Sequence, residues 1–153
     1  MDEKNKVVVH YADGRIVKGS TQDFHPDRGT FRVVLPNDVE TLRVDMDELK
    51  AVFFVKQLEH STPHPRAKEF SAEDSNRGNG RPIAVRFKDG ELLVGYAHSY
   101  SAERPGFFVL PVGSGDNNLR AFVVRTSTLA VKLGTAAEEM VQAAKDEEKP
   151  KAA

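Results

Sequence analysis

Histidine and acidic side chains are the residues of this chain that could bind a metal or move a proton. His60 and His64 have the spacing that puts two ligands on one face of a helix, but Pro63 and Pro65 exclude a helix there. The acidic run at residues 45–48 is not followed by the glycine-containing ligand loop of a calcium site. We therefore expect no metal site.

Covalent catalysis has equally little support. Ser99 and Ser101 lack the glycine-flanked elbow that exposes a catalytic serine, and the chain has no glycine-rich loop to bind phosphates. The absence of cysteine excludes a disulfide framework and thiolate metal sites. The sequence predicts a protein that is not an enzyme and holds no cofactor.

Two arginines are spaced in a way that suits phosphate groups. Arg28 and Arg32 form an R-x-x-x-R pattern, and the forked donors of arginine match phosphates and guanine edges. Residues 73–78, Glu-Asp-Ser-Asn-Arg-Gly, are similar to the D-x-S-x-x-G element of the PilZ family, with glutamate in the first place. This resemblance implies a cyclic-dinucleotide receptor as one alternative. Against it, the arginines lie across a turn into a strand, and the second element lies in a linker.

Aromatic and basic side chains in one loop offer a second binding chemistry. With Phe24, His25 and Arg28 together, a base can stack on the ring while the arginine contacts a phosphate. Tyr100 and Arg104 recur 76 residues after Phe24 and Arg28. The alternative is structural: the two rings close the ends of β-units, and the arginines pair with neighbouring acids or hold loop carbonyls.

The overall charge balance argues against the nucleic-acid alternative. The chain has 22 basic and 23 acidic residues, so it lacks the broad positive field that drives nucleic-acid binding. An RNA- or DNA-binding role is therefore possible but not favoured.

The elements that must position these loops occur twice. Residues 7–19 reappear as residues 83–95, and each copy reads as an apolar strand, a turn, and a second strand with a glycine inside it. Asp-Gly between apolar runs is typical of a two-residue type I′ hairpin, and a mid-strand glycine is typical of a strand that bends. The turn and bend positions are Asp13, Gly14 and Gly19 in the first copy, and Asp89, Gly90 and Gly95 in the second.

Each copy continues with further short strands. We expect them at residues 30–35, 41–44 and 49–55, and at 107–110, 121–125 and 129–133. This organisation predicts a first small β-barrel at 1–58, a polar linker rich in proline, glycine and serine at 59–80, and a second barrel at 81–134. Thr135 with Glu138 forms a capping-box pattern, which predicts a helix and charged tail at 135–153.

Large apolar side chains exceed what two such small barrels can bury. Residues 52–55 are apolar on both faces of their strand, which indicates burial on both sides. Packing between the copies is the first explanation, and a homodimer or a protein that docks on a sheet edge is the second. The predicted interface residues are Phe53, Phe54, Val55, Phe107 and Phe108.

The order of strands and turns resembles a small Sm-like or SH3-like barrel. More narrowly, the phrase V-x-Y-x-D-G-x-x-x-K-G-x-T-x-D-F, followed by D-E-L-K-A-V-F-F-V at residues 47–55, looks like an uncharacterised bacterial domain family. The first phrase runs from Val9 to Phe24, and the second copy departs from it with Val94, Ala97 and Ser99. The resemblance implies a domain found alone or attached to signalling modules.

These observations predict an all-β protein of two tandem five-stranded barrels packed together, with a short C-terminal helix. The function that we expect is that of a non-catalytic regulatory or adaptor protein acting through protein contacts. We expect it to be cytoplasmic, because there is no apolar segment long enough for a membrane span. The predicted contact residues are Phe24, His25, Arg28, Arg32, Tyr100 and Arg104.

Overall fold

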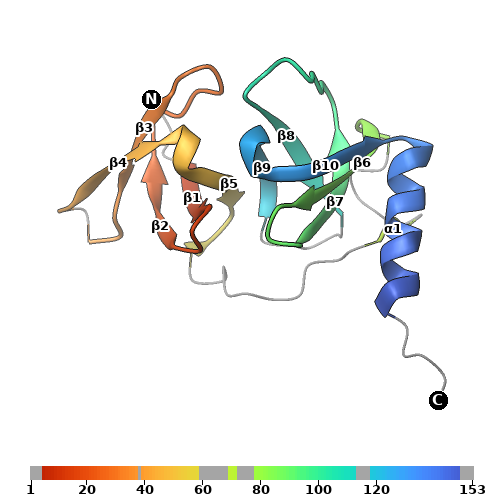
Figure 1. The fold of residues 1–153 in the computed structure, drawn as a ribbon. Coiled ribbons are helices and arrows are strands. Elements are labelled where there is room, and N and C mark those ends of the chain that lie inside the picture. The colour runs from red at the N-terminus through yellow and green to blue at the C-terminus, as the bar shows by residue number, and fades with distance from the viewer. Residues whose placement is uncertain (1–4, 38, 59–68, 72–77, 113–117, 149–153) are drawn as a thin grey trace.

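The computed structural model describes residues 5–37, 39–58, 69–71, 78–112 and 118–148. These residues form ten β-strands and one α-helix (Figure 1). The predicted β class and C-terminal helix are therefore confirmed. The strands are β1 (Asn5–Tyr11), β2 (Ile16–Thr21), β3 (Thr30–Val34), β4 (Thr41–Asp45), β5 (Leu49–Val55), β6 (Arg81–Phe87), β7 (Leu92–Ala97), β8 (Gly106–Pro111), β9 (Asn118–Val124) and β10 (Thr128–Leu133), and the helix is α1 (Thr135–Glu148).

All ten strands belong to one open sheet, in which every pairing is antiparallel. The strand order is β10-β6-β7-β8-β9-β5-β1-β2-β3-β4, so β10 and β4 are its edges. Two tandem five-stranded barrels were predicted, with separate barrels or one merged sheet left open; the strands form one sheet that does not close. Closure of the first half would need β5 to pair with β4, but the second edge of β5 pairs with β9.

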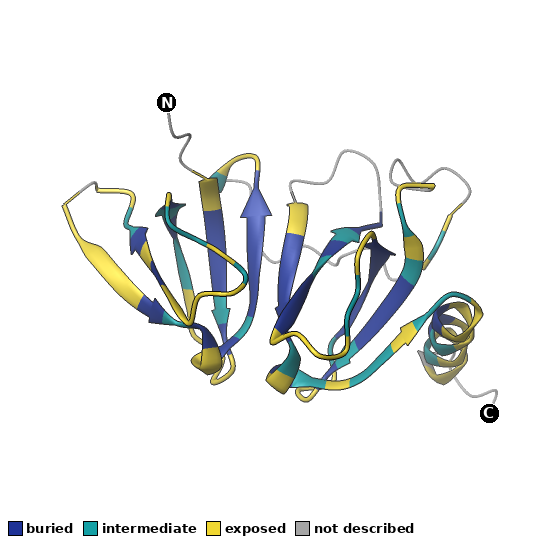
Figure 2. Cartoon of the chain, turned by 90° about the horizontal axis from the view of Figure 1, so that it is seen from above, coloured by how far each residue is buried: buried dark blue, intermediate teal, exposed yellow. Residues whose placement is uncertain are grey.

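The two halves of the sheet have the same internal order. It is β5-β1-β2-β3-β4 in the first half and β10-β6-β7-β8-β9 in the second. Each half curls around its own buried cluster, and the two lie side by side (Figure 2). A one-turn helix joins the fourth and fifth strands of each half: η1 (Met46–Glu48) in the first and η3 (Arg125–Ser127) in the second.

Strand β5 serves both halves, which explains why both of its faces are apolar. Val52 and Phe54 belong to the first-half core, whereas Phe53 and Val55 belong to the second-half core. In β8, Phe107 lies in the second-half core and Phe108 packs against the first-half core. All five predicted interface residues therefore lie in or against these two cores.

The Asp-Gly turns lie where the sequence places them, but with a different geometry. In the first hairpin the N–H of Gly14 donates to the Tyr11 carbonyl at 3.1 Å, and the N–H of Tyr11 donates to the Arg15 carbonyl at 2.9 Å. Gly14 has a φ of 99° and Gly90 a φ of 96°. Three residues thus separate the closing pair, as in a type I turn with a glycine bulge. The predicted two-residue type I′ turn is wrong.

Gly19 and Gly95 are close-approach positions. A Cβ at Gly19 would lie 2.6 Å from Val33 Cγ1, and one at Gly95 would lie 2.6 Å from Val109 Cγ1. A Cβ at Gly19 would also collide with the Val34 carbonyl, and a Cβ at Gly95 would collide with the Leu110 carbonyl. These glycines let β3 and β8 cross tightly over β2 and β7.

The C-terminal helix covers the outer face of the second half. Its buried side chains, Ala137 and Val141, pack against Ala84, Val94 and Tyr96 of β6 and β7. Most of the predicted linker at 59–80 lies outside the described residues, but Phe70 packs on Tyr96 with ring centroids 5.6 Å apart. Within the described parts of the chain, no helix has the length and apolar character of a membrane span.

Candidate functional site

The predicted aromatic loop residue Phe24 packs inward. It follows β2 and forms edge-to-face contacts with four rings, at centroid distances of 5.1 Å to Phe31, 5.2 Å to Phe54, 6.2 Å to Phe108 and 5.3 Å to Phe122. Two of these rings come from the second half of the sheet. Phe24 remains half-buried, so part of the ring is presented at the line where the halves meet.

The basic residues of the same loop are not arranged as a phosphate clamp. The Arg32 guanidinium Nε lies 3.5 Å from Asp23 Oδ2, and the Arg32 N–H donates to Asp23 Oδ1 at 2.9 Å. Burial would raise the pKa of Asp23, but the hydrogen bonds from Arg32 and Thr21 outweigh it and lower the pKa. Arg32 is thereby tied to its own loop. His25 accepts the Asp27 N–H at 3.1 Å through Nδ1, and Arg28 is exposed.

In the second half, the loop that carries Tyr100 and Arg104 is held by a residue that the sequence did not single out. Arg125 donates to the Arg104 carbonyl at 2.7 Å, to the Ser101 carbonyl at 2.6 Å and to the Tyr100 hydroxyl at 3.2 Å. The Tyr100 ring packs edge-to-face on Phe107 at 5.0 Å. Tyr100 is therefore part of the loop support, while the Arg104 side chain is exposed.

A second arginine, Arg120 on β9, forms the most unusual surface feature. Its guanidinium carbon lies 4.5 Å from the ring centroids of both Phe54 and Phe108. This position follows from the pairing of β5 with β9, which sets Phe54 opposite Arg120. Among the described residues, no carboxylate or carbonyl hydrogen-bonds the guanidinium. Partial desolvation lowers the pKa of Arg120, although not enough to discharge an arginine at neutral pH.

Arg120, Phe24, Phe54 and Phe108 together make what we call the Arg120 surface. The sequence gives no sign of it, because Arg120 precedes the most strongly apolar part of its strand and its aromatic neighbours come from three other segments. Only the pairing between the two halves brings a cation onto the rings. Chemically, the surface offers stacked aromatic area with guanidinium donors that no described carboxylate or carbonyl occupies, which suits a carboxylate or phosphate next to an apolar group.

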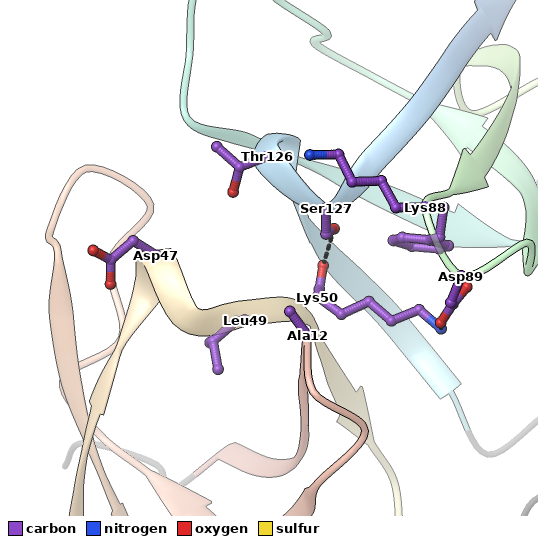
Figure 3. Close-up of a pocket in the computed structure, with 9 residues that line it drawn as sticks. Ala12, Asp47, Leu49, Lys50, Lys88, Asp89, Thr126 and Ser127 are labelled. Carbon is purple, nitrogen blue, oxygen red and sulfur yellow. Dashed lines mark hydrogen bonds and ion pairs between the residues drawn. The ribbon is translucent and has the colours of Figure 1, made fainter.

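On another side of the junction lies a pocket of about 330 Å³ (Figure 3). Two of its charged side chains, Lys50 and Asp89, join the halves. Lys50 Nζ lies 2.7 Å from Asp89 Oδ2 and 2.6 Å from Glu91 Oε1, and only 12% of its side chain is exposed. The pocket is lined by Ala12, Asp47, Leu49, Lys50, Phe87, Lys88, Asp89, Thr126 and Ser127.

A buried serine at this pocket forms a second contact between the halves. Ser127 Oγ lies 2.9 Å from the Lys50 carbonyl (Figure 3). It also lies 2.7 Å from the Val124 carbonyl, and both carbonyls are acceptors. Its hydroxyl is thus directed to backbone oxygens and not to a base. Among the described residues that line the pocket, the hydrogen bonds of Lys50 and Ser127 join the two halves.

Several sequence candidates for ligand chemistry lie elsewhere. His60, His64 and residues 73–77 of the PilZ-like element fall outside the described residues. Within the residues that the structure describes, no three histidine or acidic side chains gather as metal ligands.

Comparison with known proteins places the chain in a family. Residues 3–134 match the model of a family of unknown function (DUF6982), so the chain belongs to that family. The match spans both halves of the sheet and ends just before α1. No curated protein and no solved structure gives a match.

Proposed function

We propose that this member of the DUF6982 family is a non-catalytic regulatory or adaptor protein that acts through protein–protein contacts. The observation that carries this proposal is the Arg120 surface. Arginine and aromatic side chains dominate the binding energy of protein interfaces because they combine large contact area with directed donors. Here the stacking on Phe54 and Phe108 holds the guanidinium in place before any partner arrives.

The chemistry of this surface defines the kind of partner. A guanidinium without a carboxylate neighbour among the described residues favours an acidic side chain or a chain terminus. The half-buried rings of Phe24 and Phe108 favour an apolar group beside it. A pre-ordered arginine also loses less conformational entropy on binding than a mobile one. The partner is therefore a protein segment in which a carboxylate and an apolar side chain are adjacent.

We further infer that the two halves are copies of one small-barrel module of Sm-like or SH3-like type. Matching hydrogen bonds support this inference. The Ala12 N–H donates to the Glu48 carbonyl at 2.9 Å, and the Lys88 N–H donates to the Ser127 carbonyl at the same distance. A cytoplasmic location is part of the proposal and agrees with a chain that contains no cysteine.

The two ligand alternatives have weaker support. An R-x-x-x-R clamp would need Arg28 and Arg32 to converge, but Arg32 is paired with Asp23. Nucleic acid would need a row of cations, whereas the Arg120 surface contains one. Both alternatives are distinguishable outcomes of the experiment below.

The test uses the full chain, tagged and recovered from its native host. Wild type is compared with Arg120→Glu and with Arg81→Glu, a matched change at an exposed arginine of β6. Because Arg120→Glu reverses the only charge of the surface, we expect at least a tenfold loss of co-purified protein, while Arg81→Glu retains it. Arg28→Glu in parallel tests the sequence-predicted loop. Circular dichroism checks that each variant is folded.

Two outcomes contradict the proposal. One is an Arg120→Glu variant that is folded and keeps every partner at wild-type level. The other is recovered material that disappears on nuclease treatment, or stabilisation of the chain by added cyclic dinucleotides, either of which would assign the surface to a different ligand class.

A further inference from the structure

The second half of the sheet docks on one defined face of the first half. This face consists of the outward side chains of β1 and β5. Val8, Ala51, Phe53 and Val55 belong to the same buried cluster as the core of the second half. Val8 is 3% exposed and Phe53 is 1% exposed, so the second half covers this face almost completely.

The equivalent face of the second half is covered by α1. Val8 corresponds to Ala84 by the 76-residue offset, and Ala84 is fully buried in the cluster that contains Ala137 and Val141 of α1. The helix lies at the end of the molecule away from the first half (Figure 1). At β6 it thus occupies the place that the second half occupies at β1 of the first, and from there it extends over β7.

The two edge strands of the sheet correspond to the two strands that pair where the halves meet. Strand β10 is the counterpart of β5, and β4 is the counterpart of β9, because η1 and η3 join them in the same way. Inside the chain, β9 pairs with β5 with Phe53 opposite Ala121 and Ala51 opposite Val123. Transferred to the edges, the same register puts Lys132 of β10 opposite Leu42 in β4 of a second copy.

The edge residues make pairing between β10 and β4 of a second copy weaker than the internal pairing between β5 and β9. Lys132 stands where β5 has Phe53, and Arg43 stands where β9 has Phe122, so the edge pairing buries less apolar area than the internal one. Charged side chains on edge strands also oppose uncontrolled pairing. Apolar side chains remain available nonetheless, since Leu42 is 37% exposed and Leu129 is 70% exposed.

The helix itself is lightly attached. Two of its side chains, Ala137 and Val141, are buried, and Met140 and Ala144 pack against the same cluster while partly exposed. Its ion pair between Lys145 Nζ and Glu69 Oε2, at 2.7 Å, is exposed on both sides and therefore contributes little. Undocking of α1 would cost far less free energy than unfolding of either half.

From these observations we propose that α1 is a displaceable cap over a self-association face. When α1 undocks, the outer face of β6 and β7 becomes accessible, and the adjacent edge strand β10 pairs with β4 of a second copy in the register of the β5–β9 pair. The occupant is a second copy of this chain, because the chain already contains the matching strand pair.

The test exploits the absence of cysteine from the chain. Leu42→Cys and Lys132→Cys are introduced together into the full-length protein. The two positions are at opposite edges of the sheet, so a disulfide between them forms between molecules. Val141→Asp is then added to undock α1, with Gln142→Asp as the control at an exposed position of the same helix.

We expect at least tenfold more disulfide-linked multimer with Val141→Asp than with Gln142→Asp after mild oxidation. The pair Ile16→Cys and Lys132→Cys, out of register, should give none above background in either case. If Val141→Asp unfolds the protein, Met140→Asp at a half-buried position replaces it. Hydrogen exchange of the α1 amides confirms that the helix is undocked.

Two results overturn the proposal. The first is an undocked helix with no increase in the linkage between residues 42 and 132. The second is an equal yield of the disulfide between residues 42 and 132 whether α1 is docked or undocked. That result would show that the helix does not restrict self-association. A second, cysteine-free readout in the undocked background uses the predicted register: Leu42→Glu should strengthen association beside Lys132, and Leu42→Lys should weaken it.

Discussion

At the residue scale, the absence of a single Cβ decides how two strands cross. Gly95 lies on β7 where β8 passes over it, and Gly19 is in the same position between β2 and β3. Neither glycine has a positive φ, so the requirement is for space and not for an unusual backbone. This distinction matters for the size of the effect, because a backbone carbonyl cannot move aside as a side chain can.

Gly95→Ala is therefore expected to destabilise the protein by about 3 kcal/mol, at the upper end of overpacking effects. The new Cβ would collide with the Leu110 carbonyl and lie 2.6 Å from Val109 Cγ1. Chemical denaturation of wild type and variant measures the change in the free energy of unfolding. Gly29→Ala is the control, because nothing lies within 4 Å of a Cβ there. Equal stability of the Gly95 variant and wild type would show that β8 does not approach β7 as described.

At the element scale, β5 belongs in sequence to one half and in packing to both. Its alternating side chains enter the two cores in turn, with Phe53 in the second-half core and Phe54 in the first-half core. Strand β9 mirrors this arrangement, since Phe122 and Val124 complete the first-half core. Each half therefore completes its core with side chains from the other.

Phe53→Ala should accordingly destabilise the second half, although Phe53 lies in the first half of the sequence. We expect a loss of about 3–5 kcal/mol, the usual cost of removing a buried phenylalanine ring. Native-state hydrogen exchange locates the effect: protection should fall for the amides of β6, β7 and β8. Ile16→Ala, at a residue that is 53% exposed, should change little. Loss of protection confined to β1–β4 would contradict the shared role of β5.

At the scale of the whole molecule, the halves are also joined by charge. Lys50 of β5 bridges to Asp89 and Glu91 in the β6–β7 turn. Burial would raise the pKa of Asp89, but the hydrogen bonds from Lys50 and from the Glu91 N–H outweigh it and hold the pKa below its usual value. A carboxyl group with a lowered folded-state pKa stabilises the fold above its unfolded-state value and loses this contribution as the pH falls through the folded-state value.

The lowered pKa of Asp89 predicts how the stability of an Asp89→Asn variant depends on pH. The variant should be less stable than wild type at neutral pH, and the difference should shrink below about pH 4, the pKa of an unperturbed aspartate. Unfolding free energies measured from pH 7 to pH 2 provide the comparison. A difference between wild type and Asp89→Asn that stays constant with pH would exclude the Lys50 contact as its source.

Much of the local structure follows from the sequence alone. Alternation of apolar residues and the Asp-Gly turns locate the strands, since a strand must bury one face and a hairpin needs a residue that tolerates positive φ. The capping-box pattern of Thr135 with Glu138 predicts a helix at the C-terminus, and residues 52–55 predict a strand buried on both sides. These features depend on neighbours in the chain, which the sequence displays directly.

Pairing between distant segments was decided only by the tertiary structure. Whether β5 closes its own barrel or pairs with β9 depends on a comparison of long-range contacts that local patterns do not contain. That choice made one open sheet instead of two barrels, set Arg120 on Phe54 and Phe108, and tied Lys50 to Asp89. Of the loop arginines chosen from the sequence, Arg28 and Arg104 are exposed and Arg32 pairs with Asp23 of its own loop, whereas Arg120 and Arg125 contact rings or carbonyls of other segments. An arginine acquires its role from what it stacks on and donates to, and those neighbours come from strands that only folding brings together.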